Sequence, residues 1–399
     1  KGTFVKRFIE YLVEGALKIS GSITSITILL IIIFLFKEGS GLFKNPVVEE
    51  GYVLTVNRDN PVEHITSFQI KEIYDENITN WKELGGIDSP ILVFRFGDLE
   101  NYFSPEELGQ EYENIPQCLN TLINREKNII AFFPELYLPK DFSGKQIAKE
   151  KISPVDFFGG KEWYPTAQPA AQFGLIPLLL GTLWVSIGAI LLALPFGISV
   201  AIYMAELASK QMRSILKPLI ELLAGIPSVV FGFFGLVVIV PLVQKTFNLP
   251  VGETALSGSI VLAIMALPTI ITVAEDALKN TPRAMKEASL ALGATQWQTI
   301  YKVVIPYSIS GITSAIVLGV GRAVGETMAV LMVTGNAAII PHTLLEPVRT
   351  IPATIAAELG EAPSGGAHYQ ALFALGAILF LITLILSISV EYISNKKNK

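Results

Sequence analysis

The chain has 399 residues, of which 51% are hydrophobic, 16% are charged and one is cysteine. This composition excludes a disordered chain and a small secreted module held together by disulfides. A lone Cys118 also excludes an intrachain disulfide, a redox pair and a cysteine zinc site. Residues 45–165 hold 11 basic and 21 acidic residues, a net charge of −10, whereas the remainder carries +5. We therefore expect a membrane protein with one acidic soluble insert, and no nucleic-acid partner for either part.

Six stretches are apolar and long enough to cross a bilayer, whose hydrocarbon core of about 30 Å requires roughly 20 helical residues. They lie at about residues 19–36, 174–204, 218–243, 255–274, 307–333 and 371–393. The first is too long for a signal peptide and no small-residue cleavage site follows it, so we interpret it as a retained span. Prolines interrupt several of these runs, as is common in the broken helices of transporters.

Basic residues in the short flanks predict the orientation, because cytoplasmic loops of membrane proteins are enriched in lysine and arginine. The basic flanks contain Lys1, Lys6, Arg7 and Lys18; Lys210, Arg213 and Lys217; Lys279, Arg283, Lys286 and Lys302; and Lys396, Lys397 and Lys399. The opposite loops offer only Lys245 and Arg349. Both termini are therefore expected in the cytoplasm, and the insert outside.

Small residues recur in the predicted fifth span. Gly311, Ala315 and Gly319 follow a four-residue spacing, and Gly321 with Gly325 forms a GxxxG motif. Such residues let helices approach closely. The spacing is compatible both with packing inside this chain and with a subunit interface.

The same span carries two charges, Arg322 and Glu326, four residues apart and hence on one face of a continuous helix. A charge at membrane depth costs about 2.5–3.5 kcal/mol on insertion scales, so it requires a role. The planar fork of arginine suits an oxyanion. The alternative is an ion pair that only holds the bundle together. We favour a substrate path, because a purely structural pair is replaceable by apolar packing.

A break in the third predicted span has the sequence Gly225-Ile-Pro227-Ser228. It would free backbone N–H groups beside a hydroxyl, an arrangement that can receive an anion at the N-terminus of a helix. A simple proline kink is the alternative, and the sequence by itself slightly favours the kink.

The predicted cytoplasmic loop between the fourth and fifth spans should form two short helices bent at Gly293. Its pattern of Glu287-Ala288-Ser289, Gly293 and Val303-Val-Ile305-Pro306 resembles the EAA loop of ABC-importer permeases, with mild departures at Ser289 and Ile305. The resemblance implies that Glu287, Ala288, Gly293 and Pro306 belong to an element that docks into a groove of a separate ATPase.

Several motifs in order resemble the phosphate-specific permeases of the PstC type: residues 225–232, the loop to Pro306, residues 321–330 and residues 366–373. The resemblance covers the first span and everything after about Pro165. It implies an all-α polytopic membrane protein with six transmembrane helices of the type I importer (MetI-like) fold, carrying an external α+β insert. Substrate-path residues would be Arg322, Glu326, Thr327 and Ser228.

By the same resemblance, the chain is the non-catalytic half of a heterodimeric channel in a bacterial inner membrane. Its partners would be a PstA-type permease, a PstB-type ATPase dimer, a PstS-type periplasmic binding protein and inorganic phosphate. ATP and magnesium would be bound by the ATPase, and this chain would hold no cofactor. The expected organisation is 1–43 for the N-terminus and first span, 44–172 for the insert, and 173–399 for the permease core with its coupling loop at 275–306.

The insert resembles part of periplasmic phosphate-binding proteins over residues 61–86. From the residues, we expect a helix opened by a Thr66-x-x-Gln69 capping box, a turn at Asn80-Trp81 closed by Gly85-Gly86, and a strand at 91–96. Binding proteins of that family continue with a Ser-Gly-Thr phosphate loop, whereas this chain has Gly97-Asp98-Leu-Glu100-Asn101, whose carboxylates would repel a dianion.

About 125 residues are too few for both lobes of a binding protein. We therefore expect a degenerate domain that docks or gates the separate binding protein, with an inert spacer as the alternative.

Other motifs are absent. His64, His342 and His368 are expected to be loop residues, and none has a metal-site spacing. The glycines at 319–325 miss a dinucleotide fingerprint, and Phe142-Ser-Gly-Lys145 lacks the upstream glycine of a P-loop. Sulfate or another oxyanion stays open as the substrate. A membrane sensor of phosphate is the competing function, although a sensor needs no charge pair at membrane depth.

Overall fold

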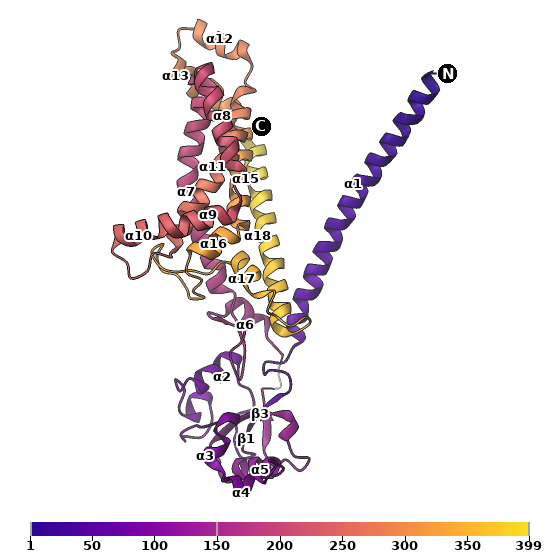
Figure 1. Ribbon diagram of the computed structural model, residues 1–399, viewed down its shortest axis with the longest axis vertical. Coiled ribbons are helices and arrows are strands. Elements are labelled where there is room, and N and C mark those ends of the chain that lie inside the picture. The colour runs from indigo at the N-terminus through magenta and orange to yellow at the C-terminus, as the bar shows by residue number, and fades with distance from the viewer. Residues whose placement is uncertain (1, 149–150, 398–399) are drawn as a thin grey trace. The chain divides into compact units, whose positions relative to one another are not determined.

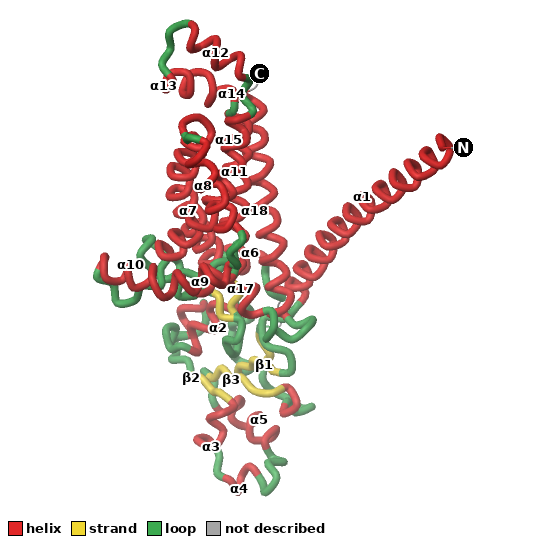
Figure 2. Tube along the Cα trace, turned by 45° about the horizontal axis from the view of Figure 1, so that its top comes forward, coloured by secondary structure: helices red, strands yellow, loops and turns green. Residues whose placement is uncertain are grey.

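The computed structural model describes residues 2–148 and 151–397 (Figure 1). Lys1 and Lys399, which contribute to the orientation argument, lie outside the described residues. The chain divides into two compact units. A helical unit comprises the residues up to 42, 180–337 and those from 341 onward, and the insert unit comprises residues 43–179 and 338–340. Figure 2 shows the strands confined to the insert unit.

Five helical segments among the described residues are long and apolar enough to cross a membrane, and the number is six if a pair of helices bent by 70° is one span. The unbroken spans are α1 (Gly2–Gly41), α7 (Ile176–Ile202), α11 (Ala255–Lys279) and α18 (Ala367–Lys397). The third span joins α9 (Ser228–Phe234), a π-helical turn and α10 (Val240–Phe247). The expected fold, an all-α polytopic membrane protein with an α+β insert, is confirmed.

The expected start of the third span near Pro218 is wrong. Residues Lys210–Ala224 form a separate helix, α8, with no buried residue, and the span begins only at Ser228. The chain breaks because proline disfavours a helical conformation at the residue before it, here Ile226, and Pro227 itself is extended, with ψ of 144°.

The expected continuous helix through the fifth span is also wrong. Helix α15 (Ile309–Gly325) ends at a glycine, Glu326 is extended with φ of −71° and ψ of 134°, and α16 (Met328–Val333) follows. Glu326 therefore does not continue the helical face that carries Arg322. The 70° bend lies at Ser308, between α14 (Ile305–Tyr307) and α15.

The small residues of α15 fall into two groups. A Cβ on Gly311 would lie 2.3 Å from Cβ of Ala277 in α11, and one on Gly319 would lie 2.7 Å from the side chain of Ile270. These two glycines thus permit close packing of α11 and α15 inside this chain. By contrast, a Cβ on Gly321 or Gly325 would meet nothing within 4 Å among the described residues, so the GxxxG motif has no packing role there.

A short helix that the sequence does not predict, α17 (Ile351–Glu358), packs against α16 and α18. The backbone N–H of Ile351 donates to Oγ1 of buried Thr182 in α7, at 3.0 Å. Next to it, a Cβ on Gly181 would lie 2.2 Å from the carbonyl oxygen of Arg349, so only glycine fits there. The segment before α18 is thereby fixed to α7.

The insert is a three-layer α/β/α unit built on a four-stranded sheet of order β2-β3-β1-β4. Its strands are β1 (Tyr52–Val56), β2 (Leu92–Arg95), β3 (Ile129–Pro134) and β4 (Lys145–Ile147). Strand β3 runs parallel to β2 and antiparallel to β1. Because side chains alternate along a strand, Ile130 and Phe132 face one layer while Ile129 and Phe133 face the other.

The two faces of the sheet are covered by α2 (Ser67–Tyr74) and α5 (Ile115–Arg125). Shorter elements are α3 (Leu99–Tyr102), α4 (Pro105–Leu108), α6 (Pro154–Gly159), β5 (Trp163–Tyr164) and β6 (Gln172–Phe173). The Thr66–Gln69 capping box is present, Gly85 closes the turn after Asn80 in a left-handed conformation, and β2 lies where a strand is expected. These three local predictions are confirmed.

Candidate functional site

Arg322 lies one turn before the end of α15, with an exposed side chain beside buried Ala323 and Val324. It forms no ion pair or hydrogen bond within residues 2–148 and 151–397. Its charge is therefore not neutralised inside this part of the chain. An arginine with five free donors in the helical unit can receive an oxyanion bidentately.

Glu326 and Thr327 form the break that follows α15. Both are half-buried, and Thr327 donates its hydroxyl hydrogen to the carbonyl of Gly325 at 3.3 Å. No ion pair joins Glu326 to Arg322 among the described residues, so the structure does not show the structural ion pair that was the alternative to a substrate path. The extended backbone at Glu326 instead separates two helices, as at the broken helices that line transport sites.

Ser228 begins α9, which packs on α16 through a glycine. A Cβ on Gly232 would lie 3.1 Å from Cα of Ala329 and 2.7 Å from Sδ of Met332, and a Cβ on Gly235 would lie 2.8 Å from Val333. Gly235 is the first residue of the π-helical turn that continues α9. Residues further along α9 and this turn therefore contact residues further along α16, so the two segments run in the same direction. Their N-termini, Ser228 and the Glu326–Thr327 break, consequently lie at the same end of the pair, and helix N-termini favour anions.

The predicted coupling loop forms α12 (Arg283–Ala291) and α13 (Gln296–Thr299), followed by a π-helical turn. Gly293 lies between them in a left-handed conformation, with φ of +86°, which confirms the expected bend. The hydroxyls of Ser289 and Thr299 lie 2.9 Å apart and link the two helices. This contact gives a physical account of the serine that departs from the usual alanine.

The same loop lies at one end of the helical unit (Figure 1), and its large apolar side chains are exposed. Leu292 is 89% exposed and Trp297 is 61% exposed, while Glu287, Ala288 and Pro306 are exposed as well. An exposed cluster of large apolar side chains next to charged ones is typical of a protein–protein contact. The arrangement fits a docking element.

The insert contains a cavity of about 540 Å³ at the carboxyl end of β2. Arg95 lies over the ring of Tyr74, with Cζ 5.4 Å from the ring centroid, and donates to the carbonyl of Tyr74. Asp98 lines the same cavity. The guanidinium is thus partly occupied and a carboxylate stands beside it, which disfavours a phosphate dianion.

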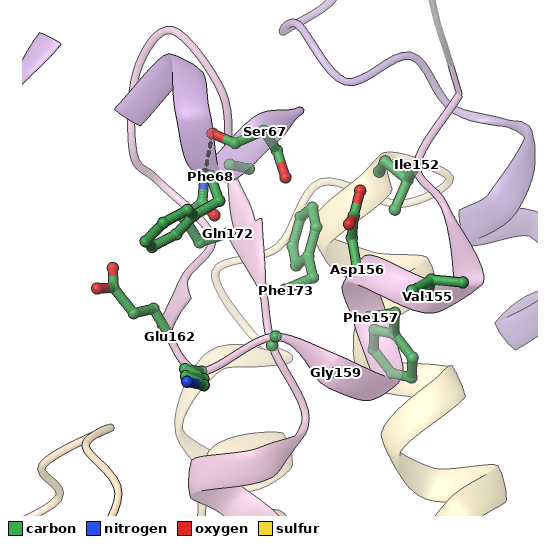
Figure 3. Close-up of a pocket in the computed structure, with 14 residues that line it drawn as sticks. Ser67, Phe68, Ile152, Val155, Asp156, Phe157, Gly159, Glu162, Gln172 and Phe173 are labelled. Carbon is green, nitrogen blue, oxygen red and sulfur yellow. Dashed lines mark hydrogen bonds between the residues drawn. The ribbon is translucent and has the colours of Figure 1, made fainter. Parts of the chain in front are cut away.

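A second cavity of the insert, about 340 Å³, has an apolar lining that includes Phe157 and Phe173 (Figure 3). Asp156 and Glu162 also line it, against one cation, Lys161, so its lining is net negative and disfavours an anion. Nearby, Lys71 pairs with Glu162 at 3.1 Å and with Asp75 at 2.8 Å. Burial acts to lower the pKa of Lys71, but these carboxylates raise it above the usual lysine range.

The sequence reading missed a charge cluster in the helical unit. Arg349 bonds Oε1 of Glu358 at 2.7 Å, and Nε2 of His368 lies 2.9 Å from the other carboxylate oxygen. His368 is in the first turn of α18, so its expected place in a loop is wrong, whereas His64 and His342 are in loops. Within the described residues, no group of three or more histidine, cysteine or acidic side chains could hold a metal ion.

Comparison with known proteins follows the division into two units. The model of the family "Binding-protein-dependent transport system inner membrane component" matches residues 193–399, and that of the "PBP superfamily domain" matches residues 34–115. The chain is 37% identical over 246 residues to the probable ABC transporter permease protein YqgH of Bacillus subtilis, covering 62% of this chain and 79% of that protein.

The chain is 39% identical over 253 residues to the phosphate transport system permease protein PstC of Mesorhizobium japonicum, covering 58% of this chain and 76% of that protein. A putative phosphate ABC transporter substrate-binding protein of Clostridium perfringens, solved with bound phosphate, is 29% identical, with a TM-score of 0.20. The match covers 28% of this chain and 51% of that protein. The chain therefore belongs to the family of inner membrane components of binding-protein-dependent transport systems, and it is a homologue of the PstC phosphate permeases.

Proposed function

We propose that this chain is the transmembrane permease subunit of an ATP-driven phosphate importer. The observation that carries the proposal is the 39% identity of this chain to permeases named for phosphate transport, which it matches across about three quarters of their length. The chain is a non-catalytic, multi-pass component of an ABC importer that works with a substrate-binding protein. A PstA-type permease completes the channel, and a PstB-type ATPase dimer drives it.

The phosphate path runs past Arg322, Glu326, Thr327 and Ser228. Support comes from the guanidinium of Arg322, which has no partner in the described part of the chain, and from the two helix N-termini that begin at Ser228 and after Glu326. Arginine supplies a bidentate fork, while the helix N-termini supply backbone donors. Glu326 lies beside these donors, and its carboxylate competes with phosphate for them, which would help to release the ion.

Coupling runs through Glu287, Ala288, Gly293 and Pro306, which dock on the ATPase. ATP and Mg²⁺ are bound by that partner, and this chain contributes no cofactor. The loop is cytoplasmic and the insert is outside a bacterial inner membrane, with both termini in the cytoplasm. Support for this orientation comes from the basic side chains Arg213, Lys279 and Lys286, which gather at the end of the helical unit that carries the loop.

The insert acts in docking or gating of the separate binding protein. Its support is the match to the PBP superfamily together with two cavities that carry carboxylates, which makes the insert itself a poor phosphate trap. Deletion of residues 50–160 should reduce transport at limiting binding protein and spare it at saturating binding protein. Unchanged transport at every concentration would make the insert an inert spacer.

ATP-dependent uptake of labelled phosphate into proteoliposomes tests the function. The vesicles contain this chain with its partner permease, ATPase and binding protein, and excess sulfate is added as the competitor. Uptake that resists sulfate is expected. Uptake that sulfate abolishes would assign the chain to another oxyanion, and an assembled complex that hydrolyses ATP without any uptake would favour a sensor.

A further inference from the structure

The cytoplasmic end of α7 does not finish as an ordinary helix. Tyr203–Leu207 form a π-helical turn, closed by the N–H of Ala208, which donates to the carbonyl of Tyr203 at 2.7 Å. Helix C-termini leave carbonyls without intrahelical donors and carry the negative end of the helix dipole. Single π-helical turns of this kind are frequent at functional sites.

A first side chain from another helix binds this end. Arg213 of α8 donates from Nε to the carbonyl of Met204 at 2.9 Å and from Nη2 to the carbonyl of Ala205 at 3.1 Å. A cation there both satisfies freed carbonyls and complements the helix dipole.

Two further side chains come from the coupling loop and converge on one residue. Nζ of Lys286, in α12, lies 2.6 Å from the Oε1 carboxylate atom of Glu206. Nε2 of Gln296, in α13, donates to the backbone carbonyl of Glu206 at 3.1 Å. The two helices of the loop are therefore both bonded to Glu206, one through its side chain and the other through its backbone.

Burial makes this contact more than an exposed ion pair. The side chain of Lys286 is 22% exposed and that of Glu206 is 12% exposed, so the pair is largely removed from water. Partly buried charges bonded to each other are less screened by solvent than those of surface pairs. The link between Ser289 and Thr299 additionally holds α12 to the last residue of α13.

Apolar packing supports the same junction. Ala201 of α7, Leu278 of α11 and Val304 of the π-helical turn after α13 are fully buried in one cluster, together with Ile312 of α15. A displacement of the coupling loop would therefore be passed to a close-packed contact as well as to the ion pair. Close-packed cores transmit displacement because they have little free volume.

We propose that Glu206 is a positioning residue that makes the cytoplasmic end of α7 the element receiving the movement of the coupling loop. The inference rests on the proposed function, because it assumes that the loop is driven by an ATPase. Lys286 and Gln296 bind the loop to Glu206, so α12, α13 and the end of α7 move as one body. Helix α7 then carries the displacement into the span.

Transport by the complete complex in proteoliposomes tests the proposal. Lys286→Met and Glu206→Gln should each lower the ratio of phosphate imported to ATP hydrolysed by about five-fold or more. The charge-swapped double variant, Glu206→Lys with Lys286→Glu, should restore most of the ratio. The matched control is Lys210→Met, which removes a lysine at the same end that has no ion pair among the described residues.

Two results would overturn the proposal: an unchanged ratio in Lys286→Met, or a loss that the charge swap does not restore. Absence of uptake in the unmodified complex would instead contradict the proposed function. The two failures are thus distinguishable.

A distance measurement covers the case in which the variants do not assemble. Spin labels are attached to Leu207→Cys, after α7, and Met285→Cys, in α12, in the complete complex, with Cys118→Ser as background; both native side chains are exposed. The distance between these two labels should stay within about 2 Å between nucleotide-free and ATP-trapped states, while the reference distance from Met285→Cys to Ile385→Cys on α18 changes. A change in the 207–285 distance as large as the change in the reference distance, or a reference distance that does not change, would contradict the proposal.

Discussion

Replacement of Gly232 by alanine tests the contact between α9 and α16 that brings Ser228 and the Glu326–Thr327 break to one end. The added Cβ would lie 2.7 Å from Sδ of Met332 and 3.1 Å from Cα of Ala329. The thioether can move aside, because methionine is flexible. The backbone of Ala329 cannot, so the two helices must separate.

Overpacking of this kind costs about 1–3 kcal/mol. The change from glycine to alanine inside a helix returns about 0.5–1 kcal/mol, which leaves a net loss of up to about 2.5 kcal/mol. Each kcal/mol lowers the unfolding midpoint of a unit of this size by about 2–4 °C. We therefore expect the midpoint of Gly232→Ala to fall by up to about 10 °C.

The assay is thermal unfolding of the purified chain in detergent, together with phosphate uptake by the assembled complex. Gly21→Ala is the matched control, because Gly21 is also within a membrane helix but a Cβ there would meet nothing within 4 Å. Uptake by Gly232→Ala should fall at temperatures well below its midpoint. A midpoint for Gly232→Ala equal to or above that of Gly21→Ala would refute the reasoning.

Three further predictions concern single positions. Gly293→Ala should weaken binding of the ATPase to the permease, measured as a dissociation constant, because alanine at a φ of +86° costs about 1–2 kcal/mol. Gly293→Asn should lose less affinity, and equal dissociation constants for the unmodified chain and both variants would contradict this prediction. Thr182→Val should lower the unfolding midpoint by removing the acceptor of the buried Ile351 N–H, a loss of about 1–3 kcal/mol, whereas Thr182→Ser should not. Burial raises the pKa of Tyr74 above the usual tyrosine range, so its phenol stays protonated in the folded insert; stability should be complete below pH of about 10 and fall above it, as the unfolded tyrosine ionises. In urea unfolding, the stability of Tyr74→Phe should fall less above this pH than that of the unmodified protein. Identical dependence of stability on pH in the two proteins would contradict the raised pKa of Tyr74.

Local signals in the sequence were sufficient wherever a few neighbouring residues determine the structure. The Thr66–Gln69 capping box and the left-handed Gly293 each depend on side chains or a backbone angle within one turn. The apolar runs likewise located the membrane helices, because burial in lipid is set by composition over about 20 residues.

Breaks inside those runs were not predictable from hydropathy. The end of α15 at Gly325 and the extended Glu326 interrupt an apolar stretch without changing its average, so the sequence suggested one helix carrying both charges. Hydropathy also starts the third span too early, because residues after Pro218 are apolar, yet they belong to α8.

Long-range polar contacts were missed because nothing in the local sequence identifies the partner. The cluster of Arg349, Glu358 and His368 joins a loop to the first turn of a span, and Lys286 reaches Glu206, 80 residues earlier. Each residue taken separately resembles an ordinary flanking charge. Only the folded helical unit brings the partners together.

Uptake of labelled phosphate by complexes carrying Arg322→Ala or Arg322→Lys tests the central claim most directly. The complexes are assembled in proteoliposomes, and their ATP hydrolysis is measured alongside. We predict that Arg322→Ala abolishes uptake while the complex still assembles and hydrolyses ATP, and that Arg322→Lys retains a fraction, because lysine keeps the charge but not the bidentate fork. Uptake by Arg322→Ala equal to that of the unmodified complex would contradict the account.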